Sequence, residues 1–145
     1  MINHVFFSDG QFESIRRRAQ TDAHVRTLTE LVLNDAKHTD DIGALAFADC
    51  PSLSYISVSE KNEAYRSLDG VLYTADLSVL ILYPPRRVGE SFTIHTATTV
   101  IREMAFFDCV YLKRIDYLGT PSQWERISIG SKNYTLLAIA KQFGA

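Results

Sequence analysis

The chain has little of what marks the common functional classes of small proteins. Its 145 residues include only two cysteines and one tryptophan, and acidic residues slightly outnumber basic ones, giving a formal net charge of −2. A nucleic-acid-binding protein usually shows a basic excess, so this balance argues against a nucleic-acid partner. No apolar run approaches the roughly 18 residues of a membrane span, and residues 1–10 lack the basic and apolar regions of an export signal. We expect no membrane insertion, although a processed or excised domain would also lack an export signal.

The motifs of common enzymes are missing as well. The histidines are His4, His24, His38 and His95, with neither HExxH spacing nor a CxxC pair beside them. No G-x-S-x-G elbow or glycine-rich loop orders a catalytic triad or holds a phosphate. His38, with Asp40 and Asp41, offers two or three metal ligands, but a polar loop is the simpler interpretation. We expect no catalytic residue, no metal and no cofactor.

What the chain does have is hydrophobic material and an internal repeat. Hydrophobic residues make up 46% of the composition, enough for one core, and the length does not require a second domain. Residues 41–58 (DIGALAFADCPSLSYISV) and 100–117 (VIREMAFFDCVYLKRIDY) match at seven of eighteen positions, where average residue usage gives roughly one. Such self-similarity indicates a repeat architecture.

The residues common to the two copies have packing roles. Alanine suits a tight bend, phenylalanine fills the space between coils, and cysteine behaves as a small buried apolar group. Each copy ends in alternating apolar residues, which predicts a short strand with one face inward. The copies align Ala46, Phe47, Cys50, Leu53, Ile56 and Val58 with Ala105, Phe106, Cys109, Leu112, Ile115 and Tyr117. Similar strands are predicted at Leu28, Leu31 and Leu33 and at Phe92 and Ile94, so that four strands lie side by side.

The spacing of these strands indicates coils of leucine-rich-repeat length with one insertion. Leu31, Ile56, Phe92 and Ile115 are 25, 36 and 23 residues apart. Two of these spacings fall within the 20–29 residues of leucine-rich repeats, and the long one requires an insertion of about a dozen residues. We assign the insertion to a β-hairpin in residues 67–85, which begins with an Asp-Gly turn and closes on Pro-Pro.

Three motifs follow one another in a fixed order along residues 28–133. They are the Ala-Phe-x-x-Cys-x-x-Leu-x-x-Ile unit, the Asp-Gly-Val-Leu-Tyr hairpin, and Gly119-Thr120-x-x-Gln123-Trp124-x-x-Ile127-x-Ile129-Gly130. Together they resemble the BspA-type leucine-rich repeats of bacterial surface proteins. The resemblance implies a right-handed solenoid that binds other molecules, often in adhesion, without enzymatic activity, at the cell surface or after secretion. The sequence departs from that family at Tyr117, where an aliphatic residue is usual, and residues 2–23 do not align with it.

Atypical segments are expected at both ends of a solenoid, because its terminal coils would otherwise expose their core. Thr120, Pro121 and Gln123 predict a short capped helix, and the spacing of apolar residues predicts a second helix over 134–143. Residues 8–24 predict an N-terminal helix with a capping box. The predicted organisation is one domain, 1–145, with an N-terminal helical cap (1–27), repeat coils (28–117) and a C-terminal cap (118–145).

The cysteines and the densest basic run have structural interpretations. The predicted strand at Phe92 lies between the coils of Cys50 and Cys109, which places them about 9.6 Å apart, beyond the roughly 7 Å limit of a disulfide. We therefore expect two buried free thiols. The basic run 16–18 (RRR), together with Arg26, could contact phosphate or an acidic partner, but a solvated helix face explains it more simply.

Strand alternation provides the main candidate surface. If the apolar strand residues point inward, their neighbours point outward on one continuous sheet, a kind of face that repeat proteins use for recognition. The outward residues are Glu30, Val32, Tyr55, Ser57, Ser91, Thr93, Arg114 and Asp116. A second candidate is the hairpin, which we expect to protrude as an insertion. Its candidate residues are Tyr73, Tyr83, Arg86 and Arg87.

The sequence favours a non-enzymatic leucine-rich-repeat module that recognises a protein or a glycan. Tyrosine and arginine are enriched at binding hot spots, although an outward tyrosine on a strand often reflects β-propensity alone. The alternative is a structural spacer, or a fragment of a larger bacterial surface protein. A thiol-dependent or metal-dependent enzyme is a third hypothesis, which rests only on the two cysteines and the scattered histidines.

Overall fold

The computed structural model describes the backbone of residues 4–7 and 30–33 and the backbone and side chains of residues 52–144. This part of the chain forms short strands and two five-residue helices, α3 (Pro121–Glu125) and α4 (Tyr134–Ala138). The strands are β1 (His4–Phe7), β2 (Glu30–Leu33), β3 (Tyr55–Val58), β4 (Tyr65–Leu68), β5 (Val71–Thr74), β6 (Val79–Leu82), β7 (Ser91–Ile94), β8 (Val100–Ile101), β9 (Arg114–Tyr117), β10 (Ser128–Ile129) and β11 (Ala140–Phe143). They build three sheets, ordered β1-β2-β3, β10-β8-β6-β5-β4 and β11-β9-β7.

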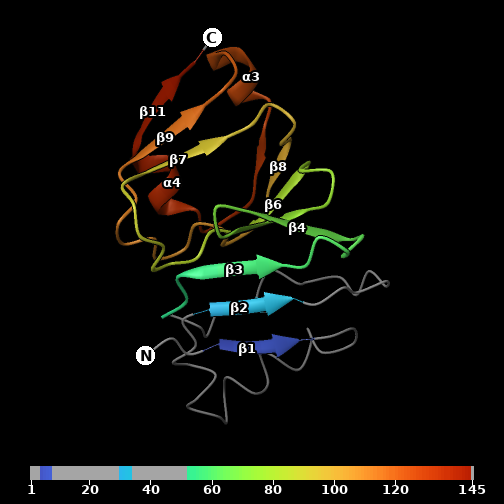
Figure 1. Cartoon of the computed structure of the whole chain (residues 1–145). Coiled ribbons are helices and arrows are strands. Elements are labelled where there is room, and N and C mark those ends of the chain that lie inside the picture. Colours follow the sequence, from blue (N-terminus) through green and yellow to red (C-terminus); the bar gives the residue numbers. More distant parts are fainter. Residues whose placement is uncertain (1–3, 8–29, 34–51, 145) are drawn as a thin grey trace.

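The first and third of these sheets are parallel ladders in which equivalent residues of successive coils pair. Leu31 lies opposite Ile56 in one ladder, and Phe92 lies opposite Ile115 in the other. Each ladder gains one strand per coil, so the coils stack from the N-terminal to the C-terminal end of the chain (Figure 1). The predicted short parallel strands are therefore confirmed.

Besides these two ladders, a further parallel ladder runs along the other side of the stack, and the sequence did not predict it. It consists of β6, β8 and β10, where Val79 pairs with Val100 and Val100 with Ser128. In Figure 1 the chain crosses from β7 to β8 and returns to β9, so one coil contributes a strand to each ladder. The strands β8 and β10 have only two residues each, which is too short for a period-two pattern to be recognised.

The predicted hairpin exists, but it divides the predicted four-strand sheet into two. Strands β4, β5 and β6 pair antiparallel, and β6 also pairs in parallel with β8 in the ladder β6-β8-β10. The turn between β4 and β5 lies against β3, where the Ile56 amide donates to the Gly70 carbonyl at 3.0 Å. Because this turn occupies the edge of β3, β3 and β7 belong to different sheets. The expectation of one continuous sheet is wrong for this reason.

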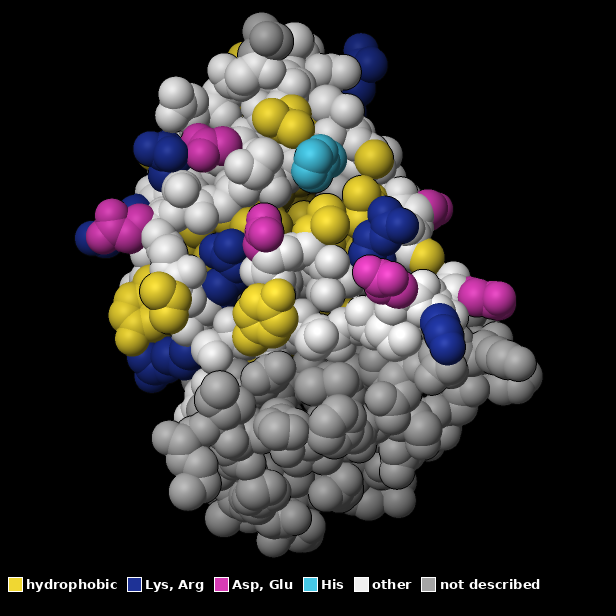
Figure 2. Space-filling view, in the orientation of Figure 1, with side chains coloured by type: hydrophobic (Ala, Val, Ile, Leu, Met, Phe, Trp, Pro, Cys, Tyr) yellow, Lys and Arg dark blue, Asp and Glu magenta, His cyan; other side chains and the backbone are white. Residues whose placement is uncertain are grey.

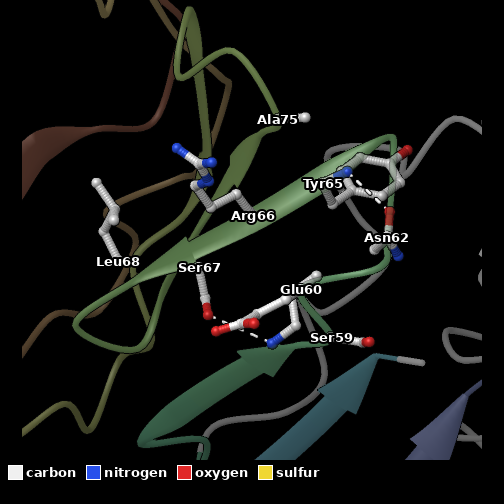
Figure 3. Close-up of a pocket in the computed structure, with 9 residues that line it drawn as sticks. Ser59, Glu60, Asn62, Tyr65, Arg66, Ser67, Leu68 and Ala75 are labelled. Carbon is white, nitrogen blue, oxygen red and sulfur yellow. Dashed lines mark hydrogen bonds between the residues drawn. The ribbon is translucent and has the colours of Figure 1, made fainter. Parts of the chain in front are cut away.

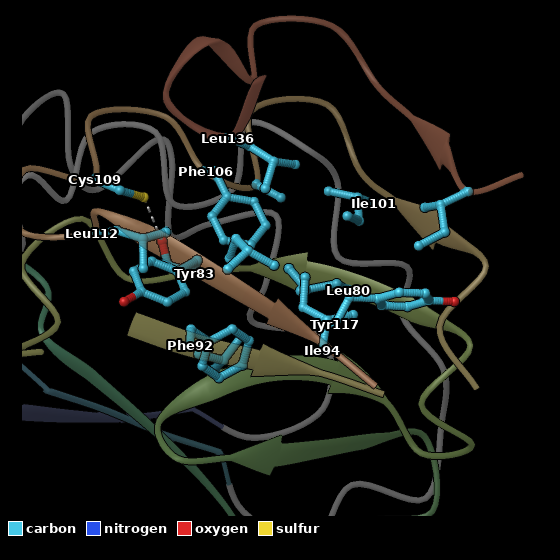
Figure 4. Packing of buried hydrophobic residues seen from close by; sticks show 14 of the residues in the cluster. Leu80, Tyr83, Phe92, Ile94, Ile101, Phe106, Cys109, Leu112, Tyr117 and Leu136 are labelled. Atoms are coloured by element: carbon cyan, nitrogen blue, oxygen red, sulfur yellow. Dashed lines mark hydrogen bonds between the residues drawn. The ribbon is translucent and has the colours of Figure 1, made fainter. Parts of the chain in front are cut away.

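The core lies between the two ladders of the C-terminal coils (Figure 4). Ala105, Phe106, Cys109, Leu112 and Ile115, the apolar positions of the second repeat copy, are all buried. Tyr83 from the end of the hairpin stacks on the Phe106 ring at 5.0 Å and meets the Phe92 ring edge-on at 5.3 Å. Leu53 and Ile56 of the first copy are also buried, whereas Ala46, Phe47 and Cys50 lie outside the described residues.

The C-terminal cap is partly as predicted. Thr120 caps α3 with a full capping box to Gln123, and Pro121 opens the helix. Trp124 packs edge-on against Tyr117 at 5.3 Å, and Phe143 contacts the same ring at 6.4 Å, which explains why Tyr117 replaces the usual aliphatic residue. The helix predicted over 134–143 is only half correct, because α4 ends at Ala138 and β11 follows.

The N-terminal cap also differs from the expectation. Residues His4–Phe7 form β1, which pairs in parallel with β2 and extends the first ladder by one coil. The cap is therefore not purely helical, and the helix predicted over residues 8–24 lies outside the described residues. The apolar run of Val5, Phe6 and Phe7 was the signal for this strand, but with four residues it could not be separated from a helix start.

Candidate functional site

Burial alternates along β3, β7 and β9 as the repeat pattern predicts. Phe92 and Ile94 are buried on β7, Ile115 and Tyr117 are buried on β9, and Ile56 is buried on β3. The outward residues of these strands form what we call the strand face: Tyr55, Ser57, Ser91, Thr93, Arg114 and Asp116. Predicted members Glu30 and Val32 pair through their backbones with Tyr55 and Ser57, and their side chains are not described.

An ion pair on β9 is the most structured polar feature of the strand face. The Arg114 guanidinium donates from Nε to one carboxylate oxygen of Asp116 at 2.8 Å and from a terminal nitrogen to the other at 3.1 Å. The pair is held at i and i+2 of one strand, so both side chains stand on the same side of the sheet. The hydrogen bond to Asp116 raises the pKa of Arg114, which keeps the guanidinium charged.

Three of the four residues that flank this ion pair on the neighbouring strands are small, and the fourth is Gln142, which lies opposite Asp116 on β11. Ser91 lies opposite Arg114 and Thr93 opposite Asp116 on β7, while Ala140 lies opposite Arg114 on the other flank. The two hydrogen bonds to Asp116 use only two of the five N–H donors of arginine. A ligand resting on the small neighbours therefore has access to the remaining donors and to the carboxylate lone pairs.

Tyr55 is the exposed aromatic residue of the strand face, and it lies on β3, in a different sheet from the Arg114–Asp116 pair. Its ring packs on Gly70, where an added Cβ would lie 2.6 Å from the tyrosine Cδ2 atom. Gly70 also has φ +83°, a conformation that non-glycine residues rarely adopt. Tyr55 remains 46% exposed while one side of its ring is fixed by the turn. This gives an aromatic contact surface that loses little conformational freedom on binding.

The predicted hairpin residues divide into core and surface. Tyr73 and Tyr83 are both 1% exposed, so the expectation that they protrude is wrong. The hairpin lies flat in the second sheet, and this packing turns both rings inward. Burial raises the pKa of Tyr73, whose hydroxyl has no hydrogen-bond partner among the described residues. Arg86 is exposed.

The Arg87 side chain is used in contacts within the fold. Its Nε donates to the Asp69 carbonyl at 2.8 Å, and a terminal nitrogen donates to the Tyr83 hydroxyl at 3.2 Å. The guanidinium lies 5.0 Å from the centre of the Phe92 ring, within cation–π range. Arg87 thus connects the hairpin turn, which lies against β3, to β7. It bridges the place where the ladder β1-β2-β3 ends and the ladder β7-β9-β11 begins.

Cys109 behaves as the packing residue that the sequence predicted. It is buried and free, and its Sγ lies 3.8 Å from the Tyr83 carbonyl oxygen. Burial raises the pKa of the thiol well above its usual value, and the Asp108 carboxylate adds to the shift. Since the thiolate is the reactive form, this environment disfavours nucleophilic chemistry. Cys50 lies outside the described residues.

Thiol labelling tests the hypothesis of a thiol-dependent enzyme. We expect Cys109 in the folded protein to resist a disulfide-exchange reagent at neutral pH and to react rapidly once urea unfolds the chain. Peptide mapping after the reaction separates Cys109 from Cys50. Rapid labelling of Cys109 in the folded protein would contradict the buried, protonated thiol and revive the enzyme hypothesis.

The remaining sequence candidates are not supported by a described cluster. Within residues 52–144, no group of three or more His, Cys, Asp or Glu side chains could hold a metal ion. His38, Asp40, Asp41 and the basic run 16–18 lie outside the described residues. In the described part of the chain, no helix has the length and apolar character needed to cross a bilayer. Figure 2 shows basic and acidic side chains interspersed on the visible described surface, without a patch of one sign.

Sequence reasoning missed a set of exposed apolar residues on the C-terminal coils. Outside the strand face these are Val88, Phe107, Val110, Tyr111, Leu118, Tyr134 and Leu137. Some of them are next to fixed repeat positions, as Phe107 is next to Phe106. From the sequence, such residues could not be distinguished from further core residues. For Phe107, Val110 and Tyr111 the only signal was that they fall between the positions that the two repeat copies have in common.

Comparison with solved structures identifies the architecture. The chain is similar to the pneumococcal vaccine antigen PcpA, with a TM-score of 0.57 and 22% identity over 81% of this chain and 27% of the antigen. It is similar to a leucine-rich repeat protein from Eubacterium ventriosum, with a TM-score of 0.54 and 21% identity over 81% of this chain and 36% of the other. The chain has the leucine-rich-repeat fold.

A third neighbour is a leucine-rich cell surface protein from Faecalibacterium prausnitzii. Its TM-score is 0.51, with 24% identity over 81% of this chain and 34% of that protein. The predicted resemblance to leucine-rich repeats of bacterial surface proteins is therefore confirmed at the level of the fold. The chain spans about a third of the length of these leucine-rich-repeat neighbours. No protein-family model and no curated protein matches the sequence.

Proposed function

We propose that this leucine-rich-repeat chain is a non-enzymatic binding module whose partner, a protein or a glycan, contacts the strand face at Tyr55, Arg114 and Asp116. The observation that carries the proposal is the doubly hydrogen-bonded pair of Arg114 and Asp116 on β9. An exposed ion pair contributes little to stability. The unused N–H donors of Arg114 and the remaining lone pairs of Asp116 are the groups that a polar ligand would bind. The small neighbours Ser91 and Thr93 leave the pair accessible to a ligand.

The distribution of the repeat residues supports this proposal. The fixed apolar positions that are described, from Ala105 to Ile115, are buried, whereas the fixed Asp108 is exposed, so the apolar part of the repeat supplies a scaffold and leaves recognition to the other residues. Side chains on strands are held more precisely than those on loops, which lowers the entropy lost on binding. One neighbour is named as a cell surface protein and another as a vaccine antigen, which supports display outside the cell for this chain too.

A screen of immobilised glycans and extracellular-matrix proteins tests the proposal. For each partner found, we expect Arg114→Ala to weaken binding by at least about tenfold, the effect of a hot-spot residue. Asp116→Ala is expected to act similarly, because it removes an acceptor and frees the guanidinium. Lys113→Ala is the matched control, since it removes a neighbouring exposed charge that pairs with Glu90 and not with the strand face.

The screen separates this proposal from the structural alternative. A spacer role is favoured by one observation, namely that the chain spans only 27–36% of its leucine-rich-repeat neighbours. As a spacer, the chain would bind no partner, and the surface variants would behave like the wild type. If partners are found and Arg114→Ala and Lys113→Ala bind them equally well, the strand face is not the contact surface.

A further inference from the structure

A cavity of about 490 Å³ lies between the end of β3 and β4 (Figure 3). Ser59 and Glu60 line it from the segment after β3, and Tyr65 and Ser67 line it from β4. Its volume falls in the range of about 300–1,000 Å³ that is common for ligand sites. No part of the strand-face proposal uses these residues.

The walls of the cavity are held in place by hydrogen bonds. Asn62 is 7% exposed, and its Oδ1 accepts from the amides of Ala64 and Tyr65, each at 2.9 Å. The Asn62 amide donates to the Ser59 carbonyl at 3.0 Å, which closes the turn between β3 and β4. At the other end the Val58 amide donates to Ser67 Oγ at 3.3 Å. The cavity is therefore formed before any ligand arrives.

One wall of the cavity is the edge of a sheet. Strand β4 is the last strand of the order β10-β8-β6-β5-β4 in the described part of the chain. The Ala75 amide donates to the Ala64 carbonyl at 2.9 Å, so Ala64 directs its backbone groups toward the β5 side. Backbone directions alternate along an antiparallel ladder, which turns the N–H and C=O of Ser67 away from β5. Both groups of Ser67 thus face the side on which a further strand would lie.

The cavity lining has one acidic and one basic residue, Glu60 and Arg66, whose charged groups lie on different sides of β4. Figure 3 shows Glu60 and Ser67 on the same side of β4, while the guanidinium of Arg66 extends from the opposite side. Successive side chains of a strand point to opposite faces, which separates Arg66 from Ser67. The Glu60 carboxylate is the charged group on the Ser67 side of β4, and it favours a ligand that carries a positive charge. The hydroxyls of Ser59 and Ser67 already accept from the amides of Lys61 and Val58.

We propose that this cavity binds an extended peptide segment with a basic side chain. One peptide residue exchanges both backbone hydrogen bonds with Ser67, as in a hydrogen-bonded antiparallel pair, and the peptide adds a strand to β4. Its lysine or arginine side chain pairs with the Glu60 carboxylate. Leu68 and Ala75 provide apolar contacts for the flanking residues.

Amide chemical shifts measured during a peptide titration test this site. The probe is acetyl-valyl-lysyl-valine amide, added to the isotope-labelled 145-residue chain up to about 10 mM, since so short a peptide is expected to bind in the millimolar range. We expect saturable shifts at the amides of β4 and of residues 58–60. The same peptide with glutamate in place of lysine, and a version N-methylated at the lysine backbone, are expected to bind at least about tenfold more weakly.

Matched variants locate the interaction. Glu60→Gln is expected to weaken binding of the lysine peptide about fivefold to tenfold, whereas Glu63→Gln, an exposed carboxylate outside the lining, leaves it unchanged. Arg114→Ala also leaves it unchanged, which keeps this site distinct from the strand face. Absence of shifts at Ser67, equal binding of the glutamate peptide, or equal loss in the two glutamate variants would each overturn the proposal.

Discussion

Replacing Phe106 by alanine is expected to lower the free energy of unfolding by about 3–5 kcal/mol, the usual cost of removing a buried phenylalanine. Phe106 is 0% exposed, and its ring stacks on Tyr83, which in turn contacts Phe92. The ring therefore joins the hairpin to the repeat coils, and its removal leaves a cavity between them. A domain is stable by only about 5–15 kcal/mol, so this loss is a large fraction of the total.

Urea denaturation followed by tryptophan fluorescence measures the loss, because Trp124 packs against Tyr117 in the same core. Phe107→Ala is the matched control, since the next residue has the same side chain but is 38% exposed. We expect the control to change stability by no more than about 1 kcal/mol. A midpoint for Phe106→Ala as high as that of Phe107→Ala would contradict the described packing.

Much of this core could be predicted from the two repeat copies alone. Positions occupied by the same apolar types in both copies had to serve the same packing role, and in the second copy Ala105, Phe106, Cys109, Leu112 and Ile115 are buried as expected. Alternation also placed Arg114 and Asp116 outward on β9. These predictions succeeded because they depend on period and residue type, which are local properties of the chain.

The position of the hairpin could not be predicted in the same way. Spacing indicated an insertion between Ile56 and Phe92, but not whether its turn would project or fill the stack. In the structure Gly70 lies against Ile56, so the hairpin turn occupies the position beside β3 where the next parallel strand would otherwise lie. That arrangement depends on contacts between coils, such as the bond from Arg87 to Asp69, that no local pattern encodes. The prediction that Tyr73 and Tyr83 protrude was wrong for this reason.

The strand β11 shows a second limit of pattern reasoning. Leu136 and Phe143 fit a helical period, and the inward position of β11 in register with Ile115 is occupied by Lys141, which hides the strand alternation. The Lys141 ammonium donates to the Ile139 carbonyl at 2.8 Å and to the Leu136 carbonyl, near the end of α4. Residues 140–143 form a strand because they pair with β9, and this pairing outweighs their weak local preference for a helix.

Replacing Asn133 by alanine is expected to destabilise the fold by about 3–5 kcal/mol, although it deletes only a small polar side chain. Asn133 is 1% exposed, and its Oδ1 accepts from the Phe106 amide at 2.8 Å. Its Nδ2 donates to the carbonyls of Arg102 and Gly130, both at 2.9 Å. Each buried group that loses its partner costs about 1–3 kcal/mol.

Asn133 acts where two coils are in backbone contact. A Cβ added at Gly130 would lie 2.3 Å from the Glu103 nitrogen, so the two coils leave no room for a side chain at this position. The asparagine therefore joins the turn after β8 to the segment that leads into α4. Its loss should loosen the last coil as well as lower the overall stability, and hydrogen exchange at the Phe106 amide reports that loosening directly.

The matched control for Asn133 is Tyr134→Ala, which removes the neighbouring side chain on α4 that is 69% exposed. We expect Tyr134→Ala to leave both the urea midpoint and the exchange rate of the Phe106 amide close to the wild type. Asn133→Ala should shift the midpoint strongly and speed exchange at Phe106 by more than about tenfold, because the amide loses its acceptor. If exchange at Phe106 stays slow in Asn133→Ala, another acceptor holds that amide, and the inter-coil role of Asn133 is wrong.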